Sequence, residues 1–180
     1  NYPVYTAWDL GMSDSTAITF FQYYLKDNKP TPFIIDYYET TDLGNEPIVN
    51  YVTSKPYNLK WHFLPHDGAV RDSDAIARIE KLREVGLPNS SLLRRIPVDD
   101  GINMAVTGIA TGYIHKPTTA DLIRKLMLYK RKFNPLTGDY LGPEHKSESH
   151  AADSVRYMFT AIDQEFDKET CEMYLSQASQ

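Results

Sequence analysis

Short apolar runs alternate with polar turns in the first forty residues. Residues 4–10 alternate with a period of two, which is typical of a strand with two different faces. Runs rich in β-branched and aromatic residues follow at 16–25 and 33–40, separated by the turn-forming segments 11–15 and 27–32. Strands joined by short turns predict an antiparallel meander.

Beyond residue 45 the apolar positions recur mostly every three or four residues, which indicates helices separated by short strands. Asp72 or Ser73 can cap a helix that Gly86 and Pro88 would end. The other predicted elements are a short helix within 46–60 ending near Pro56, strands at 61–69 and 92–98, helices at 100–111 and 149–163, and a loop at 134–143. A meander followed by such crossovers predicts an α/β fold with a mixed sheet of five or more strands flanked by helices, the element order of the ribonuclease H-like fold.

One further helix carries its own start signal. Thr118 with Asp121 resembles a capping box, in which two side chains satisfy free backbone groups of the first turn. The apolar positions Leu122, Leu126, Tyr129 and Phe133 would then form its buried stripe. The sequence therefore predicts a helix that continues to about Phe133.

Composition limits the class of protein. The chain has 180 residues, 42% hydrophobic and 24% charged, which predicts one folded domain over 1–165 and a polar tail over 166–180. The single Cys171 allows neither an internal disulfide nor a thiolate zinc site, which favours a reducing compartment. A net charge of −5 argues against a general nucleic-acid coat protein. It does not exclude a nuclease, because bound divalent cations add positive charge where carboxylates cluster.

Three aspartates stand where predicted elements begin or end. Asp9 ends the first strand, Asp67 ends the fourth, and Asp153 lies in the first turns of the last helix, three residues after His150. If the first and fourth strands are adjacent, these carboxylates converge and need a cation to offset their mutual repulsion. Carboxylates favour Mg²⁺ or Mn²⁺, and two such ions can hydrolyse a phosphodiester.

Each aspartate also has a simpler interpretation. Asp9 and Asp67 stand beside turns, where aspartate is common, and Asp153 could merely favour the positive end of a helix dipole. His150 could be solvated. The prediction of a metal site therefore depends on all of them converging in one fold.

Three segments in this order resemble the nuclease domain of the large terminase subunit of tailed double-stranded DNA bacteriophages, over residues 4 to 162: "AWDLGMSDSTAITFF", "FLPHDGA" and "GPEHKSESHAADSVRYMF". The resemblance implies a ribonuclease H-like fold and a metal-dependent endonuclease that cuts concatemeric DNA during genome packaging. Carried over by position, Asp9, Asp67 and Asp153 would hold Mg²⁺ or Mn²⁺, with His150 as a further ligand. Lys146 departs from the family pattern, in which an acidic residue often stands there.

The same resemblance implies partners and a location. In that family the nuclease domain follows an N-terminal packaging ATPase in one polypeptide, which this chain would lack. Double-stranded DNA, the small terminase subunit and the portal protein would be partners, in the cytoplasm of the infected bacterial host. No P-loop motif occurs in the sequence, so P-loop ATP hydrolysis is not expected.

Because the chain is acidic on average, DNA would need a local basic surface. A run of charges on a helix is more commonly a solvated face, and this interpretation stays open for most of the candidates. The candidate cations are Arg71, Arg124, Lys125, Lys130, Arg131, Lys132 and Lys146.

Other functions fit parts of the pattern. The "DLGMSDS" segment also resembles the phosphate-binding hairpin of actin-like ATPases and sugar kinases, in which Asp9 would hold magnesium for ATP. A Holliday-junction resolvase or a transposase-type domain would use similar acids. A non-catalytic module that docks on the portal would leave the acids solvated.

Overall fold

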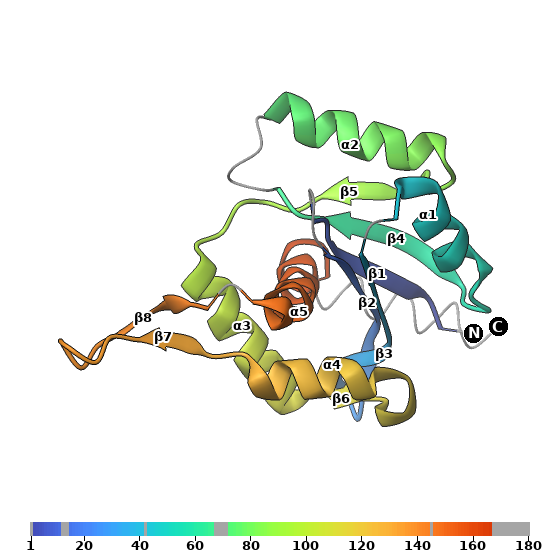
Figure 1. The fold of residues 1–180 in the computed structure, drawn as a ribbon. Coiled ribbons are helices and arrows are strands. Elements are labelled where there is room, and N and C mark those ends of the chain that lie inside the picture. The colour runs from blue at the N-terminus through green and yellow to red at the C-terminus, as the bar shows by residue number, and fades with distance from the viewer. Residues whose placement is uncertain (1, 12–14, 42, 67–71, 145, 167–180) are drawn as a thin grey trace.

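The computed structural model describes residues 2–11, 15–41, 43–66, 72–144 and 146–166 (Figure 1). Its main sheet has six strands in the order β5-β4-β1-β2-β3-β6, and it mixes antiparallel and parallel neighbours. The predicted mixed α/β architecture is therefore confirmed. The strands are β1 (Val4–Asp9), β2 (Ser15–Lys26), β3 (Lys29–Thr41), β4 (Leu59–Leu64), β5 (Ser90–Leu92) and β6 (Tyr113–Ile114).

Helices cover both faces of this sheet, as Figure 1 shows. One face packs against α5 (Ser147–Glu165), with α3 (Val98–Thr111) and α4 (Lys116–Leu128) beside it. The other packs against α1 (Asn45–Ser54) and α2 (Asp72–Glu84). Two cores result, one on each side of β1. No helix in the described ranges is long and apolar enough to cross a bilayer.

The alternation predicted for β1 is confirmed, because its odd and even residues enter different cores. Tyr5 and Ala7 lie in the core beneath α5, whereas Val4 and Trp8 lie in the core beneath α1 and α2. Asp9 continues the odd series, and its side chain contacts α5. The period of two in the sequence thus selects the face on which Asp9 lies.

The fifth strand lies earlier than predicted. The sequence favoured residues 92–98, but β5 spans Ser90–Leu92 and pairs with β4 only as far as Leu64. A backbone hydrogen bond from Leu93 N to Leu64 O, 2.9 Å long, is the last link to β4. Beyond it the described part of β4 offers no partner, so residues 93–97 connect to α3 without pairing.

The capping prediction for α4 was wrong. His115 is the N-cap residue and makes no side-chain capping bond, while Thr118 lies inside the helix. The hydroxyl of Thr118 donates to the Ile35 carbonyl of β3, and a kink follows at Thr119, where φ is −123°. A tertiary hydrogen bond has replaced the local one that the sequence indicated.

The buried stripe of α4 also ends earlier than predicted. The helix stops at Leu128, and Phe133 lies in strand β7 (Arg131–Phe133) with 54% of its surface exposed. Strand β7 and strand β8 (Tyr140–Pro143) form a hairpin that projects from the molecule (Figure 1). The sequence predicted a helix and a loop there. The chain reverses at Gly138, whose φ of +76° favours glycine.

The glycines of α3 allow this helix to approach α5 closely. A Cβ added at Gly108 would lie 1.9 Å from the ring of Phe159, which is buried and cannot swing into solvent.

We expect Gly108→Ala to lower the free energy of unfolding by about 2 kcal/mol, despite the helix propensity of alanine. Urea denaturation measures this change. Gly142→Ala is the matched control, because a Cβ at Gly142 would meet nothing within 4 Å; equal stabilities of both variants would contradict the packing.

Candidate functional site

The site begins at the end of β1, where the sheet meets α5. Asp9 Oδ2 lies 2.9 Å from Nδ1 of His150, although the two residues are 141 positions apart in the sequence. Asp153 lies one helical turn after His150 and close enough to influence the ionisation of Asp9. The structure thus brings Asp9 and His150 into contact and places Asp153 nearby, while the predicted convergence of Asp9, Asp67 and Asp153 stays a prediction.

Burial and the charge of Asp153 oppose ionisation of the Asp9 carboxyl, whereas His150 and Arg156 favour it. Burial raises the pKa of the Asp9 carboxyl, and the hydrogen bond from His150 opposes this shift only in part. The negative charge of Asp153 raises the pKa further. Two carboxylates held together in a buried place repel each other unless positive charge joins them. The donor set fits a hard divalent cation, since it offers carboxylate oxygens and one imidazole.

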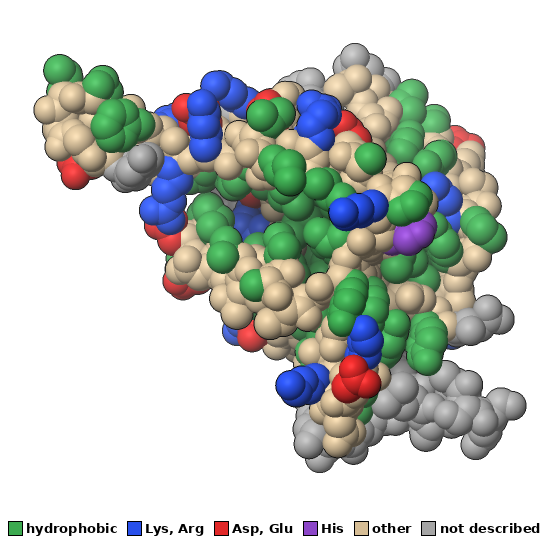
Figure 2. Space-filling model, turned by 90° about the horizontal axis from the view of Figure 1, so that it is seen from below, with side chains coloured by type: hydrophobic (Ala, Val, Ile, Leu, Met, Phe, Trp, Pro, Cys, Tyr) green, Lys and Arg blue, Asp and Glu red, His purple; other side chains and the backbone are tan. Residues whose placement is uncertain are grey.

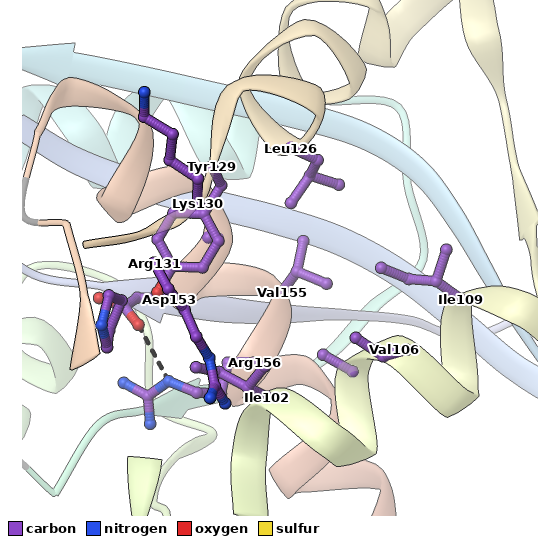
Figure 3. Close-up of a pocket in the computed structure, with 13 residues that line it drawn as sticks. Ile102, Val106, Ile109, Leu126, Tyr129, Lys130, Arg131, Asp153, Val155 and Arg156 are labelled. Atoms are coloured by element: carbon purple, nitrogen blue, oxygen red, sulfur yellow. Dashed lines mark hydrogen bonds and ion pairs between the residues drawn. The ribbon is translucent and has the colours of Figure 1, made fainter. Parts of the chain in front are cut away.

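Arg156 orients Asp153, and sequence reasoning assigned it no role. Its Nε donates to Asp153 Oδ1 over 2.9 Å (Figure 3). Its guanidinium lies over the Tyr157 ring, 4.4 Å from the centroid. Helix α3 closes on this side chain at Gly101, where a Cβ would lie only 2.7 Å from Arg156. The spacing of three residues between Asp153 and Arg156 was the available signal for this pair.

The third predicted carboxylate, Asp67, lies outside the described residues, as does Arg71. Strand β4 runs parallel to β1, with Ala7 opposite Phe63, so both strands leave the sheet at the edge where Asp9 lies. Within the described ranges, no group of three His, Cys, Asp or Glu side chains is arranged to hold a metal ion. The metal site therefore stays a prediction, and Asp67 decides whether it is complete.

Most of the cations predicted for DNA binding take part in ion pairs. Lys125 is largely buried and pairs with Glu39 of β3, whose carboxylate also accepts from Tyr37, so it supports the fold. The amino group of Lys130 points away from the groove drawn in Figure 3. The exposed pairs are Arg124 with Asp121, Arg131 with Asp99 and Lys146 with Glu144. Lys132 is exposed on the hairpin.

An apolar groove of about 330 Å³ opens beside Asp153, between α3, α4 and α5. Ile102, Ile109 and Val155 line its walls, and Arg131 reaches toward Arg156 at one end (Figure 3). Figure 2 shows the hollow edged by hydrophobic side chains, with further hydrophobic surface on the projecting hairpin. Sequence reasoning missed this groove, because its lining comes from three helices and the hairpin of β7 and β8.

Solved structures of large terminases share this fold. The nuclease domain of the SPP1 bacteriophage large terminase (g2p), solved with bound Mn, aligns with a TM-score of 0.67 and 17% identity, over 91% of this chain and 87% of that one. The P22 large terminase nuclease domain gives 0.63 and 16%, over 89% and 81%. The domain from thermophilic phage G20c, with bound cobalt, gives 0.55 and 12%, over 89% and 81%.

This chain spans about 40% of the large terminase of another thermophilic bacteriophage, with a TM-score of 0.64 and 15% identity over 89% of the chain. No family model and no curated protein matches the sequence. At such low identities the likeness establishes the architecture alone. The chain has the ribonuclease H-like fold of large terminase nuclease domains, as its sequence motifs predicted.

Proposed function

We propose that this chain is a divalent-metal-dependent DNA endonuclease domain of a phage large terminase. The observation that carries the proposal is the contact of Asp9 with His150, joined by Asp153, at the sheet edge where β1 and β4 both end. The fold shared with terminase nuclease domains supports the same conclusion. Asp67, three residues after β4, is proposed as the third acid.

The chemistry follows from what each side chain does. Asp9 and Asp153 would hold Mg²⁺ or Mn²⁺ with Asp67, and His150 would either join them as a ligand or orient Asp9 through their hydrogen bond. Arg156 keeps the Asp153 carboxylate in one orientation. Two divalent ions bound there would supply an activated water and stabilise the leaving oxygen of a phosphodiester.

The wider role is also proposed, on the likeness to complete large terminases. The domain would act with an N-terminal packaging ATPase of the same polypeptide and cut concatemeric double-stranded DNA at the start and end of packaging. The small terminase subunit and the portal protein would be its partners, in the cytoplasm of the infected host.

Plasmid cleavage tests the proposal. We expect nicking and linearisation with Mn²⁺ or Mg²⁺, and none with EDTA. Activity should fall as the pH is lowered, because protons compete with the metal for Asp9, whose pKa is raised by burial. A thermal shift with Mn²⁺ should weaken over the same pH range, and Asp9→Asn should remove most of it.

Three results would contradict this function. Unchanged thermal stability with Mn²⁺, together with intact plasmid, would favour a non-catalytic docking module. Selective cutting of four-way junctions would indicate a resolvase instead. Specific binding of magnesium-ATP, measured by calorimetry, would favour the actin-like alternative.

A further inference from the structure

A second cavity, of about 260 Å³, lies near the candidate metal site and shares Arg156 with the apolar groove. We call it the arginine pocket. Among the described residues that line it there is no carboxylate. Its polar lining comes from His66, Arg94, Arg95, Arg156, Tyr157 and Thr160.

The topology of the sheet brings these cations together. Strands β4 and β5 are parallel and end in register at Leu64 and Leu92, so the residues after both strands emerge at one edge. His66 follows β4, while Arg94 and Arg95 follow β5. This is the edge at which β1 ends with Asp9.

Helix α5 links the arginine pocket to the candidate metal site. Arg156 lines the pocket and donates to Asp153, which lies three residues earlier, or about 4.5 Å along the helix axis. A nucleic-acid strand whose scissile phosphate lies at Asp9 and Asp153 would therefore bring a neighbouring phosphate close to the pocket.

The arginines in the pocket are held in place by other groups. The backbone N–H of Arg94 donates to Gln164, and its guanidinium pairs with Asp163 near the end of α5. Arg95 Nε donates to His66 Nδ1 over 2.9 Å, which fixes the plane of that guanidinium. Planar guanidinium groups that are oriented in advance suit the tetrahedral oxygens of a phosphate, which they can bind through two parallel hydrogen bonds.

We propose that the arginine pocket binds a backbone phosphate of the DNA strand that is cut. This phosphate lies next to the scissile phosphate. This inference rests on the proposed nuclease function and adds a subsite to it. The pocket positions the duplex without reading its sequence, since contacts to phosphate carry no base information. Arg95 is the principal contact, while Arg156 connects the pocket to Asp153.

Arg95→Gln tests the subsite, with Lys60→Gln as control, because Lys60 is an exposed cation in the first half of β4. Affinity for a duplex of about 30 base pairs is measured at several salt concentrations, and plasmid cleavage with Mn²⁺ gives KM and kcat. We expect Arg95→Gln to weaken binding about tenfold at low salt and to reduce the slope of log affinity against log salt by about 0.9. KM should rise while kcat changes little, and Lys60→Gln should match the wild type.

Further outcomes separate the subsite from the nuclease function. Arg95→Lys should restore the salt slope but only part of the affinity, because lysine keeps the charge and loses the planar fork. If Arg95→Gln binds and cuts like the wild type, the subsite is wrong and the nuclease function stands. If the folded wild type neither binds nor cuts DNA, the nuclease function fails and the subsite fails with it.

Discussion

Asp153→Asn should lower the rate of plasmid cleavage by about a thousandfold or more, which corresponds to about 4 kcal/mol of transition-state stabilisation. An amide keeps the size of the side chain and can still accept the hydrogen bond from Arg156 Nε. It removes the negative charge that would hold a divalent cation beside Asp9. The loss should therefore appear in cleavage and in Mn²⁺ binding, while the fold is retained.

Glu165→Gln is the control for this variant. Glu165 is an exposed acid at the far end of the same helix, so neutralising it changes the charge of α5 by the same amount. Circular dichroism should give the same spectrum for both variants and the wild type. Normal cleavage by Asp153→Asn would remove Asp153 from the catalytic set.

The second large effect concerns acid stability and the opposite face of the sheet. His62 is 5% exposed and shares a 2.7 Å hydrogen bond with Thr6, which also accepts from the Trp8 indole over 2.7 Å. Burial lowers the pKa of His62 from 6.5 to about 4. Between pH 6.5 and pH 4, His62 is protonated in the unfolded chain but not in the folded chain. Acidification from pH 6.5 to 4 should thus cost about 3 kcal/mol of unfolding free energy.

Urea denaturation at several pH values measures this loss. His62→Gln should flatten the profile in that window, whereas His115→Gln, at an exposed histidine, should leave it unchanged. Asp9 contributes with the opposite sign, because its raised pKa means that acid favours the folded state there. The comparison is therefore best made in the Asp9→Asn background, and a steep profile in His62→Gln would disprove the assignment.

Local patterns predicted the elements that bury their own side chains. The meander of β1, β2 and β3 and the last helix followed from periodicity, because their apolar positions coincide with the cores they form. Prediction failed where pairing across the chain decides the outcome. β5 ends where β4 offers no further partner, and the hairpin of β7 and β8 replaces a helix that amphipathic spacing extended to Phe133.

The residues of the candidate site, like the elements of the fold, could be predicted from the sequence only in part. Asp9, His150 and Asp153 could be selected from the sequence because each stands at the start or end of an element and belongs to a recognisable motif. Arg95 in the arginine pocket could not, because its role depends on where the chain runs after β5 has paired with β4. Of the cations predicted on α4, Lys125 pairs with Glu39, and DNA binding by the others stays a prediction.

The contact between Asp9 and His150 has a consequence for protein synthesis. These residues are separated by 141 positions, so a growing chain on the ribosome contains the first acid long before the helix that completes the site has been made. Under the proposed function, a nascent chain without α5 cannot cleave the genome. Nuclease activity therefore begins only when translation of the domain is nearly complete.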